Sequence, residues 1–517
     1  MIPHHVFADN FQLQRVMQAL VPHLFEIHRY GMPCGPADFN ESVLVYKYEH
    51  SRVRLANLKR KLFDLVGYEL NLGSWQQMRE LLYEKLGLDP APIIKATGEA
   101  KSDKYALCML HYLNRQDPKL DEIFNTMIEL RKLEKTISNQ YAKLLLTEDC
   151  ECAKSKDSSL CMKCGGTKRG KVLGYDPYYC SIQNGWVYTH STYLQNQITL
   201  RIGSVDPSIG TTPRANYTRK LFPRDIYVNK PGRTFVFTDL SKAERRFCAV
   251  YFDDPVMLDE VERGHAAVAE FGCELFGYTP EQVARGTEGY ANTKTALYLS
   301  QLGGGGNALH KTLINNFEYR SEEDCWQIIG KIIRKYPYQQ KIFGLAWEDL
   351  KKGWWQTFHK HRFIAQRPYE LEAYTDWRQI QTGANEKAKE AFATFVRFYS
   401  ASKIQDPATG TGTQIASLRY CEELAKRPHL KDCHLTIIRH DELVTDCPVE
   451  CAQEIQALQE YCLGECFEKP QPYLDGVERP DLFFGMNCES EIARQWGCAK
   501  PEKIQDAEIR NGVVYRS

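Results

Sequence analysis

Apolar residues recur at helical spacing through the first part of the chain. They do so in FQLQRVMQALVPHLFEIHRYG and in VRLANLKRKLFDLVG, between residues 10 and 70, and each run ends near a glycine. Ser74 is the predicted N-cap of a helix that continues through residues 75–88 and ends before Pro90. A longer helix is predicted over residues 119–146, where alternating charges indicate a solvated face.

The pattern changes twice in the rest of the chain. Strand-like segments dominate residues 185–240, helical patterns dominate residues 253–350, and strands return near residues 434–447. We find no internal repeat and no low-complexity tract. A strand-bearing core interrupted by a long helical insertion predicts an α+β fold, with the insertion as a domain of its own.

Composition narrows the class of protein. With 517 residues, 43% of them hydrophobic, the chain can form about three domains with real cores. Lys plus Arg and Asp plus Glu number 66 each, a balance that neither excludes nor supports a nucleic-acid partner. No signal peptide or membrane span is recognisable, so we expect a soluble cytoplasmic protein with no membrane partner, in the host cytoplasm if its source is a phage. Its 18 cysteines should then be mostly reduced thiols.

Two acidic motifs carry the strongest chemical signal. Asp239 lies in TFVFTDLSKAERRFCA, and Asp441 precedes Glu442 in HLTIIRHDELVTD, in each case where an apolar, β-branched run meets polar residues. Either aspartate alone could simply end a strand. Together, two carboxylates from separate strands can share Mg²⁺, which prefers oxygen ligands and keeps positions open for water or phosphate. The pair therefore predicts a phosphoryl-transfer site.

A second pattern lies between the acidic motifs, in YANTKTALYLSQLGGGG. Tyr290, Lys294, Tyr298 and Leu302 are each four residues apart and form one stripe on a helix. Lys294 could hold a triphosphate while Tyr298 stacks on a base or ribose. Taken alone, the stripe could equally be an ordinary amphipathic surface.

The order of these motifs resembles the family A DNA polymerases, of the DNA polymerase I type. DLSKAERRFCA is similar to the first family motif, KTALYLSQLGG to the fingers helix and RHDELV to the third motif; the resemblance runs from about residue 10 to Trp496. It implies a right-hand polymerase fold with palm, thumb and fingers. The implied parts are an N-terminal helical part of the palm (1–70), the thumb with a Cys-rich insertion at 150–164 (71–184), the palm with the first acidic motif (185–252), the fingers (253–395), and the palm with the second acidic motif and the C-terminus (396–517).

The resemblance also implies roles for individual residues. Asp239 and Asp441 would bind two Mg²⁺ ions, and Glu442 would complete the catalytic set. The residues implied in nucleotide binding are Glu244 beneath the sugar, Lys294, Tyr298 and, one turn from the family's usual position, His265. The residues implied in DNA binding are Arg201, Ser204, Asp206, Gln405 and His440.

The chain departs from the family pattern at several positions. Tyr290 replaces the arginine four residues before the fingers lysine, which removes a bidentate phosphate ligand. Leu302 replaces a tyrosine and is followed by four glycines, which predicts a mobile pivot. Gln405 and Thr409 replace an asparagine and a glutamine of the palm, and 266–268 read Ala-Ala-Val in place of Asp-Ile-His. These changes affect triphosphate and minor-groove contacts but leave the metal ligands intact.

Four cysteines form a candidate zinc site, Cys150-x-Cys152-x8-Cys161-xx-Cys164. Four thiolates can close a tetrahedral shell around Zn²⁺; the alternative is a basic loop with free thiols. A second set comprises Cys447, Cys451, Cys462 and Cys466. Residues 451–465 read as one helix, which would hold Cys451 and Cys462 about 16 Å apart, too far to share a metal.

The sequence thus predicts a template-directed DNA polymerase that extends a primer with deoxynucleoside triphosphates by two-metal phosphoryl transfer, of the kind used in phage or plasmid replication. Because the resemblance begins near residue 10, we expect no nuclease domain and no proofreading by this chain. A helicase, clamp or exonuclease would then be a separate partner. The alternatives are a single-subunit RNA polymerase, which Glu244 disfavours because a carboxylate beneath the sugar leaves little space for a 2′ hydroxyl, and a DNA-binding protein that has lost catalysis.

Overall fold

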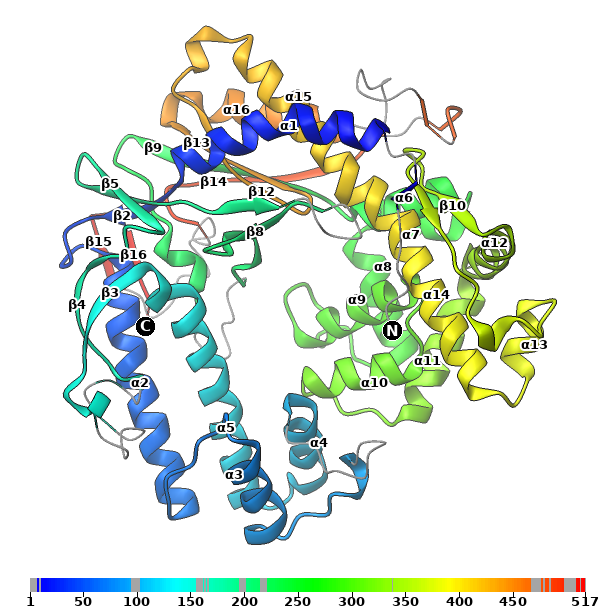
Figure 1. The fold of residues 1–517 in the computed structure, drawn as a ribbon, viewed down its shortest axis with the longest axis horizontal. Helices are drawn as coiled ribbons and strands as arrows, with labels where there is room; N and C mark the ends of the chain where they lie inside the picture. Colours follow the sequence, from blue (N-terminus) through cyan, green and yellow to red (C-terminus); the bar gives the residue numbers. More distant parts are fainter. Residues whose placement is uncertain are drawn as a thin grey trace.

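A four-stranded antiparallel sheet is the base from which the rest of the molecule extends (Figure 1). The computed structural model describes residues 7–8, 11–93, 103–154, 161, 164, 167–194, 201–213, 221–336, 338–465, 476–477, 479–482, 485–496, 508–511 and 513–516. The strands lie in the order β12 (His434–Arg439), β13 (Glu442–Pro448), β9 (Arg233–Leu240) and β14 (Cys488–Ala493). This sheet is the predicted palm.

The central strand β9 shows why one face of this sheet is buried and the other carries the site. Val236 and Thr238 point to helix α16 (Ala452–Gly464), where Thr238 donates a hydrogen bond of 2.7 Å to Gln459. Phe235 and Phe237 point to the opposite face, as alternation along a strand requires. Helices α1 (Phe11–Tyr30) and α15 (Thr411–Ala425) lie beside α16 on the covered side (Figure 1). Asp239 has the parity of Phe235 and Phe237 and therefore lies on the face away from α16.

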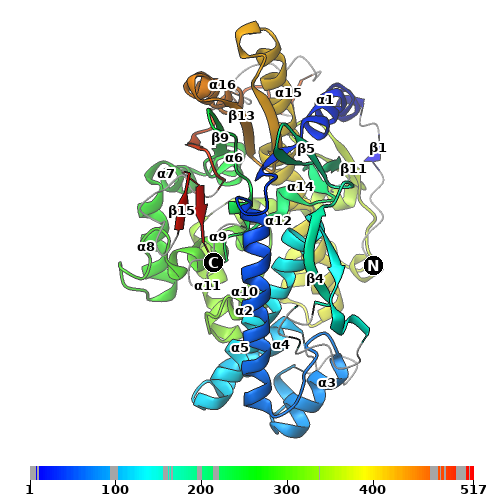
Figure 2. The ribbon, with the colours of Figure 1, turned by 90° about the vertical axis from the view of Figure 1, so that its left-hand side faces the viewer.

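The thumb is a pair of long helices, α2 (Val43–Val66) and α5 (Pro118–Thr136), with α3 (Trp75–Arg79) and α4 (Lys104–Asn114) at its tip (Figures 1 and 2). The N-cap predicted at Ser74 is confirmed, since its hydroxyl accepts from the amide of Gln77. The boundary predicted at residue 70 separates α2 from α5, although the two helices pack along one another. We therefore propose to group α2 with the thumb.

The predicted helix over residues 119–146 is wrong at its C-terminal end. Helix α5 passes into a π-helical turn at Ile137–Tyr141, and strand β3 (Leu145–Asp149) follows. Its charged residues are exposed or half-buried, and three of its glutamates also pair with bases of α2: Glu122 with Lys61, Glu129 with Arg54 and Glu134 with Lys59. These partly exposed pairs, each worth at most about 1 kcal/mol, mainly fix the alignment of the two helices.

The fingers are the helical insertion predicted from the sequence. Their helices are α7 (Pro255–Arg263), α8 (His265–Phe276), α9 (Glu288–Gln301), α10 (Gly306–Asn315), α11 (Glu322–Lys335), α12 (Tyr338–Lys352), α13 (Trp377–Thr382) and α14 (Glu386–Gln405). Helix α6 (Ala243–Tyr251) joins them to β9. A small sheet of β1 (Phe7–Ala8), β11 (Arg362–Ile364) and β10 (Trp354–Gln356) completes this part.

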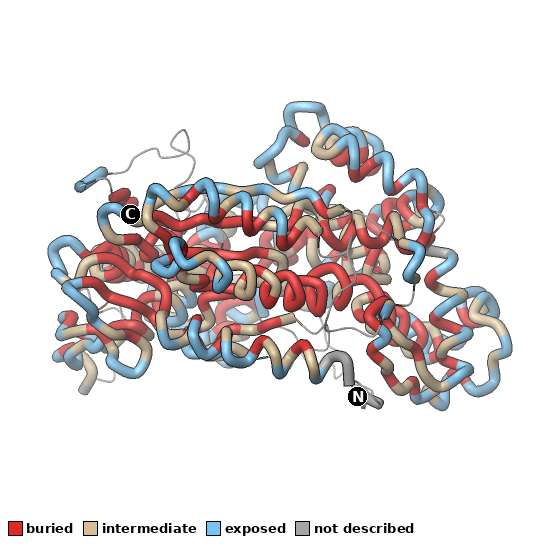
Figure 3. The backbone as a smooth tube through the Cα atoms, turned by 90° about the horizontal axis from the view of Figure 1, so that it is seen from above, coloured by how far each residue is buried: buried red, intermediate tan, exposed pale blue. Residues whose placement is uncertain are grey.

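Small strands connect the thumb with the palm. They are β2 (Met32–Pro36), β6 (Trp186–Thr189) and β5 (Cys180–Gln183) in one sheet, and the pairs β3 with β4 (Arg169–Tyr175), β7 (Thr192–Leu194) with β8 (Gly203–Val205), and β15 (Glu508–Arg510) with β16 (Val513–Tyr515). Seen from above, buried residues fill the interior, while exposed residues gather on the outer turns (Figure 3). No helix in the described ranges is both long and apolar enough to cross a membrane.

Three of the four glycines after Leu302 allow close packing of the backbone. Gly304 packs against Leu299, and Gly305 and Gly306 pack against the ring of Trp326 so closely that a Cβ at Gly306 would lie 2.4 Å from it. Close approach of the backbone therefore accounts for glycine at these three positions, and the mobility of the pivot stays a prediction.

Candidate active site

Asp239 and Asp441 meet at the edge of the palm sheet. Asp239 is near the end of β9, and Asp441 lies in the tight turn between β12 and β13. The backbone amide of Leu240 donates a hydrogen bond of 3.1 Å to the carbonyl of Asp441, which fixes the two segments together. Two aspartates that are far apart in the sequence are thereby brought side by side, as predicted.

Two glutamates flank Asp239 across the sheet. Glu442 of β13 and Glu489 of β14 are its directly opposed neighbours in the two ladders, so all three side chains lie on one face. Glu442 is buried and faces Arg439 at 3.4 Å, whereas Glu489 is exposed and pairs with Arg285 of the fingers at 3.1 Å. The sequence alone did not identify Glu489, because its pairing with β9 depends on a long-range register.

The electrostatics of the pair favour a divalent cation. Partial burial raises the pKa of Asp441, and the charge of Glu244 raises it further, while Arg201 and a hydrogen bond with Asp239 lower it. Mg²⁺ relieves the repulsion that Glu244 exerts on Asp441, and Asp239 with Asp441 leaves other coordination positions to water or phosphate oxygens. The residues present therefore fit the predicted metal.

Glu244 lies in the first turn of α6 and is the centre of a polar network. Arg201 donates to the Glu244 carboxylate and, at 2.8 Å, to the hydroxyl of Thr409, while the amide of Gln405 lies 3.3 Å from Glu244. Gln405 ends α14, and Thr409 lies in the π-helical turn Asp406–Gly410 that follows. Residues of two segments that are far apart in the sequence thus hold Glu244 in place.

The fingers helix α9 presents the predicted stripe. Lys294 lies over the ring of Tyr298 at 5.4 Å, and Tyr290 contacts His265, with 2.5 Å between the phenolic oxygen and Nδ1. Partial burial raises the pKa of Tyr298, and the charges of Glu244 and Asp441 contribute to the shift, so this ring lies close to the palm carboxylates. Leu302, the last residue of the stripe, is the C-cap residue of α9.

The predicted DNA-binding residues divide into two groups. Arg201, Gln405 and His440 lie near the carboxylates; the pKa of His440 is lowered to about 4 by burial and by Arg201 and Arg439. Ser204 is buried and accepts a hydrogen bond of 2.7 Å from the amide of Gly210. Asp206 pairs with Lys143 at 2.6 Å. The structure thus brings three of the five predicted residues to the site.

Two cations near the site were not identified from the sequence. Lys242 lies three residues after Asp239 in the first acidic motif, and Arg285 precedes α9. The sequence shows a lysine within DLSKAE. Only the fold shows that its ammonium group lies against the fingers, where it donates to the carbonyl of Val261 at 3.3 Å.

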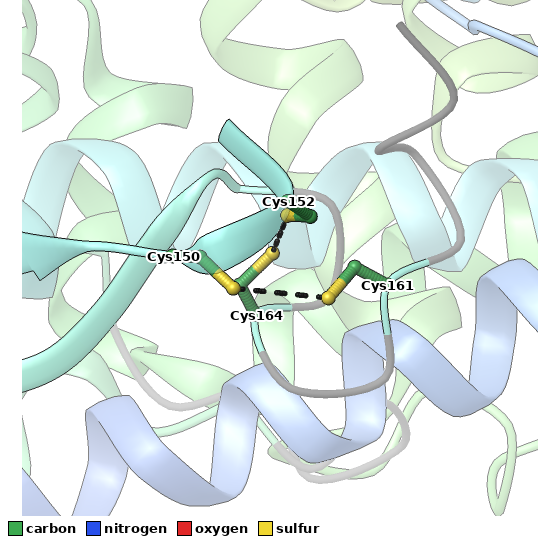
Figure 4. Close-up of side chains that lie close together, drawn as sticks. All are labelled: Cys150, Cys152, Cys161 and Cys164. Atoms are coloured by element: carbon green, nitrogen blue, oxygen red, sulfur yellow. Dashed lines mark hydrogen bonds between the residues drawn. The ribbon is translucent and has the colours of Figure 1, made fainter. Parts of the chain in front are cut away.

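The four predicted cysteine ligands also come together, at the end of β3 (Figure 4). Their sulfur atoms all lie within 4.8 Å of one another, with 3.8 Å between Cys150 and Cys161 and 3.3 Å between Cys152 and Cys164. Desolvation and hydrogen bonds between the sulfurs raise the pKa of Cys152, a strain that a metal relieves by binding thiolates. Of the second cysteine set, Cys466 lies outside the described residues.

Comparison with known proteins gives a consistent result. The model of DNA polymerase family A matches residues 43–470. The chain is 23% identical over 464 residues to the DNA polymerase of Bacillus phage SP01, and 22% identical over 426 residues to DNA polymerase I of Lactococcus lactis subsp. cremoris. These matches cover 86% and 81% of this chain but only 41% and 40% of the relatives, so the chain spans about two fifths of their length.

The fold has a counterpart among solved structures. The POL domain of Pol1 from M. smegmatis, in complex with DNA primer-template and dNTP, superposes with a TM-score of 0.67 at 16% identity, covering 94% of this chain and 72% of that chain. The right-hand arrangement of palm, thumb and fingers predicted from the sequence is thereby confirmed.

Proposed function

This chain belongs to DNA polymerase family A, and we propose that it extends a DNA primer on a template with deoxynucleoside triphosphates. The observation that carries the proposal is the convergence of Asp239 and Asp441 at the sheet edge, with Tyr298 of the fingers beside them. The primer–template would lie between thumb and fingers, with its 3′ end at the two aspartates.

Each residue at the site has a role in this proposal. Asp239 and Asp441 would hold two Mg²⁺ ions, which supply activation of the primer oxygen and stabilisation of the leaving pyrophosphate when bound. Glu442, directly opposite Asp239, adds a further carboxylate. Lys294 would bind the triphosphate, and the ring of Tyr298 would pack on the nucleotide.

Glu244 would select deoxyribose. Its carboxylate is held by Arg201 and Gln405 and cannot turn aside without losing those contacts. A fixed carboxylate beneath the sugar leaves little space for a 2′ hydroxyl, which favours DNA over RNA synthesis. Arg201 and His440 would then contact the duplex near the primer end once nucleotide and DNA are bound.

The cysteine cluster is a second proposal. Four sulfurs within 4.8 Å match the donor set of a structural zinc site, and such a site would fix the loop between β3 and β4 at the base of the thumb. Arg169 and Lys171 of β4 are exposed next to it and would place positive charge near the emerging duplex.

Extension of a labelled primer–template with deoxynucleotides, with ribonucleotides and without nucleotide tests the proposal. We expect extension with deoxynucleotides only. Extension with ribonucleotides would favour an RNA polymerase, and binding without extension would favour a protein that has lost catalysis. The lane without nucleotide tests the prediction that this chain does not shorten the primer.

A further inference from the structure

Two ammonium groups beside the site have no acidic partner among the residues that the structure describes. Lys242 donates to the neutral carbonyl of Val261, and within the described ranges no carboxylate lies at ion-pair distance from it. Lys294 is exposed over Tyr298 and is likewise unpaired with any acid in the part of the chain that the structure describes. Uncompensated cations on both sides of one site are an attractive environment for an anion.

The two lysines influence one another. The pKa of Lys242 is lowered by partial burial, and Arg245 and Lys294 contribute to the shift. Burial lowers the pKa of His265, and Arg285 and both lysines lower it further. The geometry agrees with this proximity: a Cβ built at Gly264 would lie 3.8 Å from the ammonium group of Lys242, and the next residue, His265, contacts Tyr290, which lies one turn before Lys294 on α9.

The nearby carboxylates are held by other bases. Glu260 pairs with the buried Arg245 at 2.5 Å and also accepts from Tyr336. Glu489 pairs with Arg285 at 3.1 Å and lies 3.3 Å from the hydroxyl of Ser241. Glu260 and Glu489 therefore act on Lys242 only from a distance, and neither carboxylate contacts its ammonium group.

Tyr290 explains why a second cation is needed. It lies one turn before Lys294 on α9, where the family pattern has an arginine, and its hydroxyl is engaged by His265. A neutral pair at this position leaves Lys294 alone on the helix to face a polyanion. Lys242 is a nearby base that can provide a second cation for the triphosphate, because it lies at the start of α6 and not on α9.

We propose that Lys242 binds the triphosphate of the incoming nucleotide together with Lys294, and so replaces the missing arginine of the fingers helix. This inference rests on the proposed polymerase function. Lys242 has a left-handed backbone conformation (φ 57°) at the start of α6, three residues from Asp239, and its ammonium group lies against the carbonyl of Val261 in the fingers helix α7. It contacts phosphate only and takes no part in proton transfer.

The test compares Lys242→Gln, which removes the charge, with Lys242→Arg, which keeps it. Lys387→Gln, on an exposed face of α14, is the matched control. We expect Lys242→Gln to raise the KM for deoxynucleotides about tenfold and to weaken inhibition by pyrophosphate to a similar extent, because a charge-assisted contact to phosphate is lost. Primer–template affinity should not change, and Lys242→Arg and Lys387→Gln should resemble the parent.

Two results separate this inference from the proposed function. If the parent extends primers and Lys242→Gln leaves both KM and pyrophosphate inhibition unchanged, the assignment of Lys242 is wrong. If the parent does not extend primers, the polymerase proposal fails, and calorimetric titration with inorganic triphosphate still decides the role of Lys242. Weaker triphosphate binding by Lys242→Gln than by Lys387→Gln supports the assignment, and equal binding overturns it. Thermal unfolding confirms that the variants are folded, since removal of a partly buried, unpaired charge should not lower the midpoint.

Discussion

At the scale of single residues, substitution of Asp239 or Asp441 should distinguish catalysis from DNA binding. We expect Asp239→Ala or Asp441→Ala to reduce extension by about three orders of magnitude or more, because each removes a ligand of the metals on which phosphoryl transfer depends. Primer–template affinity should remain close to that of the parent, since it comes mainly from phosphate contacts elsewhere. Extension assays and a binding titration on the same proteins measure the two effects. Extension by either variant at the parental rate would remove these residues from the proposed mechanism.

His359, beyond the active site, makes stability depend on pH. Burial lowers its pKa from 6.5 to about 4 in the folded protein, and His361 lowers it further, whereas Asp406 opposes the shift. Between pH 6.5 and pH 4 the unfolded chain therefore binds a proton that the folded protein does not. This contribution to stability is complete above pH 6.5 and decreases as the pH falls through that window, by about 1.4 kcal/mol per pH unit at most.

The measurement is the unfolding midpoint of the parent and of His359→Phe between pH 4 and pH 7. The variant should show a shallower dependence on pH whatever its absolute midpoint. His429→Phe, at an exposed position, controls for the mere loss of a histidine. Equal slopes for parent and His359→Phe would mean that His359 is protonated as easily in the folded protein as in the unfolded chain.

At the scale of elements, periodicity predicted most helices and the main strands, because each depends on local patterns of apolar residues. The Ser74 cap, α16 and the strands β9, β12 and β13 all lie where the pattern indicated. The end of α5 was wrong because nothing local distinguishes a helix from the π-helical turn and strand that follow. The ion pairs of α5 were not predicted because their partners lie on α2, and only the packing of the two helices shows this.

For the candidate site, too, the sequence predicted the residues that lie in local motifs and not those placed by long-range pairing. Resemblance to a family identified Asp239, Asp441, Glu244 and the stripe on α9, since their motifs are short and local. Glu489 was missed because its place opposite Asp239 is set by a ladder between distant strands. The lack of an ion pair at Lys242, on which its proposed function depends, was not predicted for a related reason. Whether a lysine is paired depends on where the acids of the neighbouring elements lie, and no motif contains that information.

The loop between β3 and β4 provides a test at this scale. We expect protein purified without added metal to contain about one zinc per chain, bound by Cys150, Cys152, Cys161 and Cys164. Cys164→Ser should lose the zinc and lower the unfolding midpoint, because Cys164 is fully buried and its replacement opens the shell. Elemental analysis measures the metal, and Cys273→Ser, outside the cluster, is the control. Protein that contains no metal in this assay would leave four free thiols as the correct description.

At the scale of the whole molecule, thumb and fingers both extend from the palm and contact one another through α4 and α10 (Figure 1). The three parts therefore form a closed ring. Tyr112 of α4 stacks on Tyr319 with 4.5 Å between the ring centroids. The hydroxyl of Tyr319 donates to Nδ1 of His111 at 2.9 Å, while Nε2 of His111 donates to Asp121 at 2.6 Å. If DNA lies between the arms as proposed, this contact has to open before a template without ends can leave.

The last prediction follows from that contact. Tyr319→Ala removes one stacked ring and one hydrogen bond, a loss of about 1–2 kcal/mol, and should raise the rate at which a circular primer–template dissociates by about tenfold. The same variant should make shorter products in a single binding event, measured with a trap that captures released enzyme, while its rate of nucleotide addition stays near the parental value. Tyr369→Ala, at a residue that is 82% exposed, controls for loss of a tyrosine. Tyr112→Ala should have a similar effect, and the double variant should lose less than the sum of the two, because the two rings stack on one another and Arg115 lies over both. Unchanged dissociation from circular DNA in all three variants would show that thumb and fingers separate too readily for their contact to retain the template.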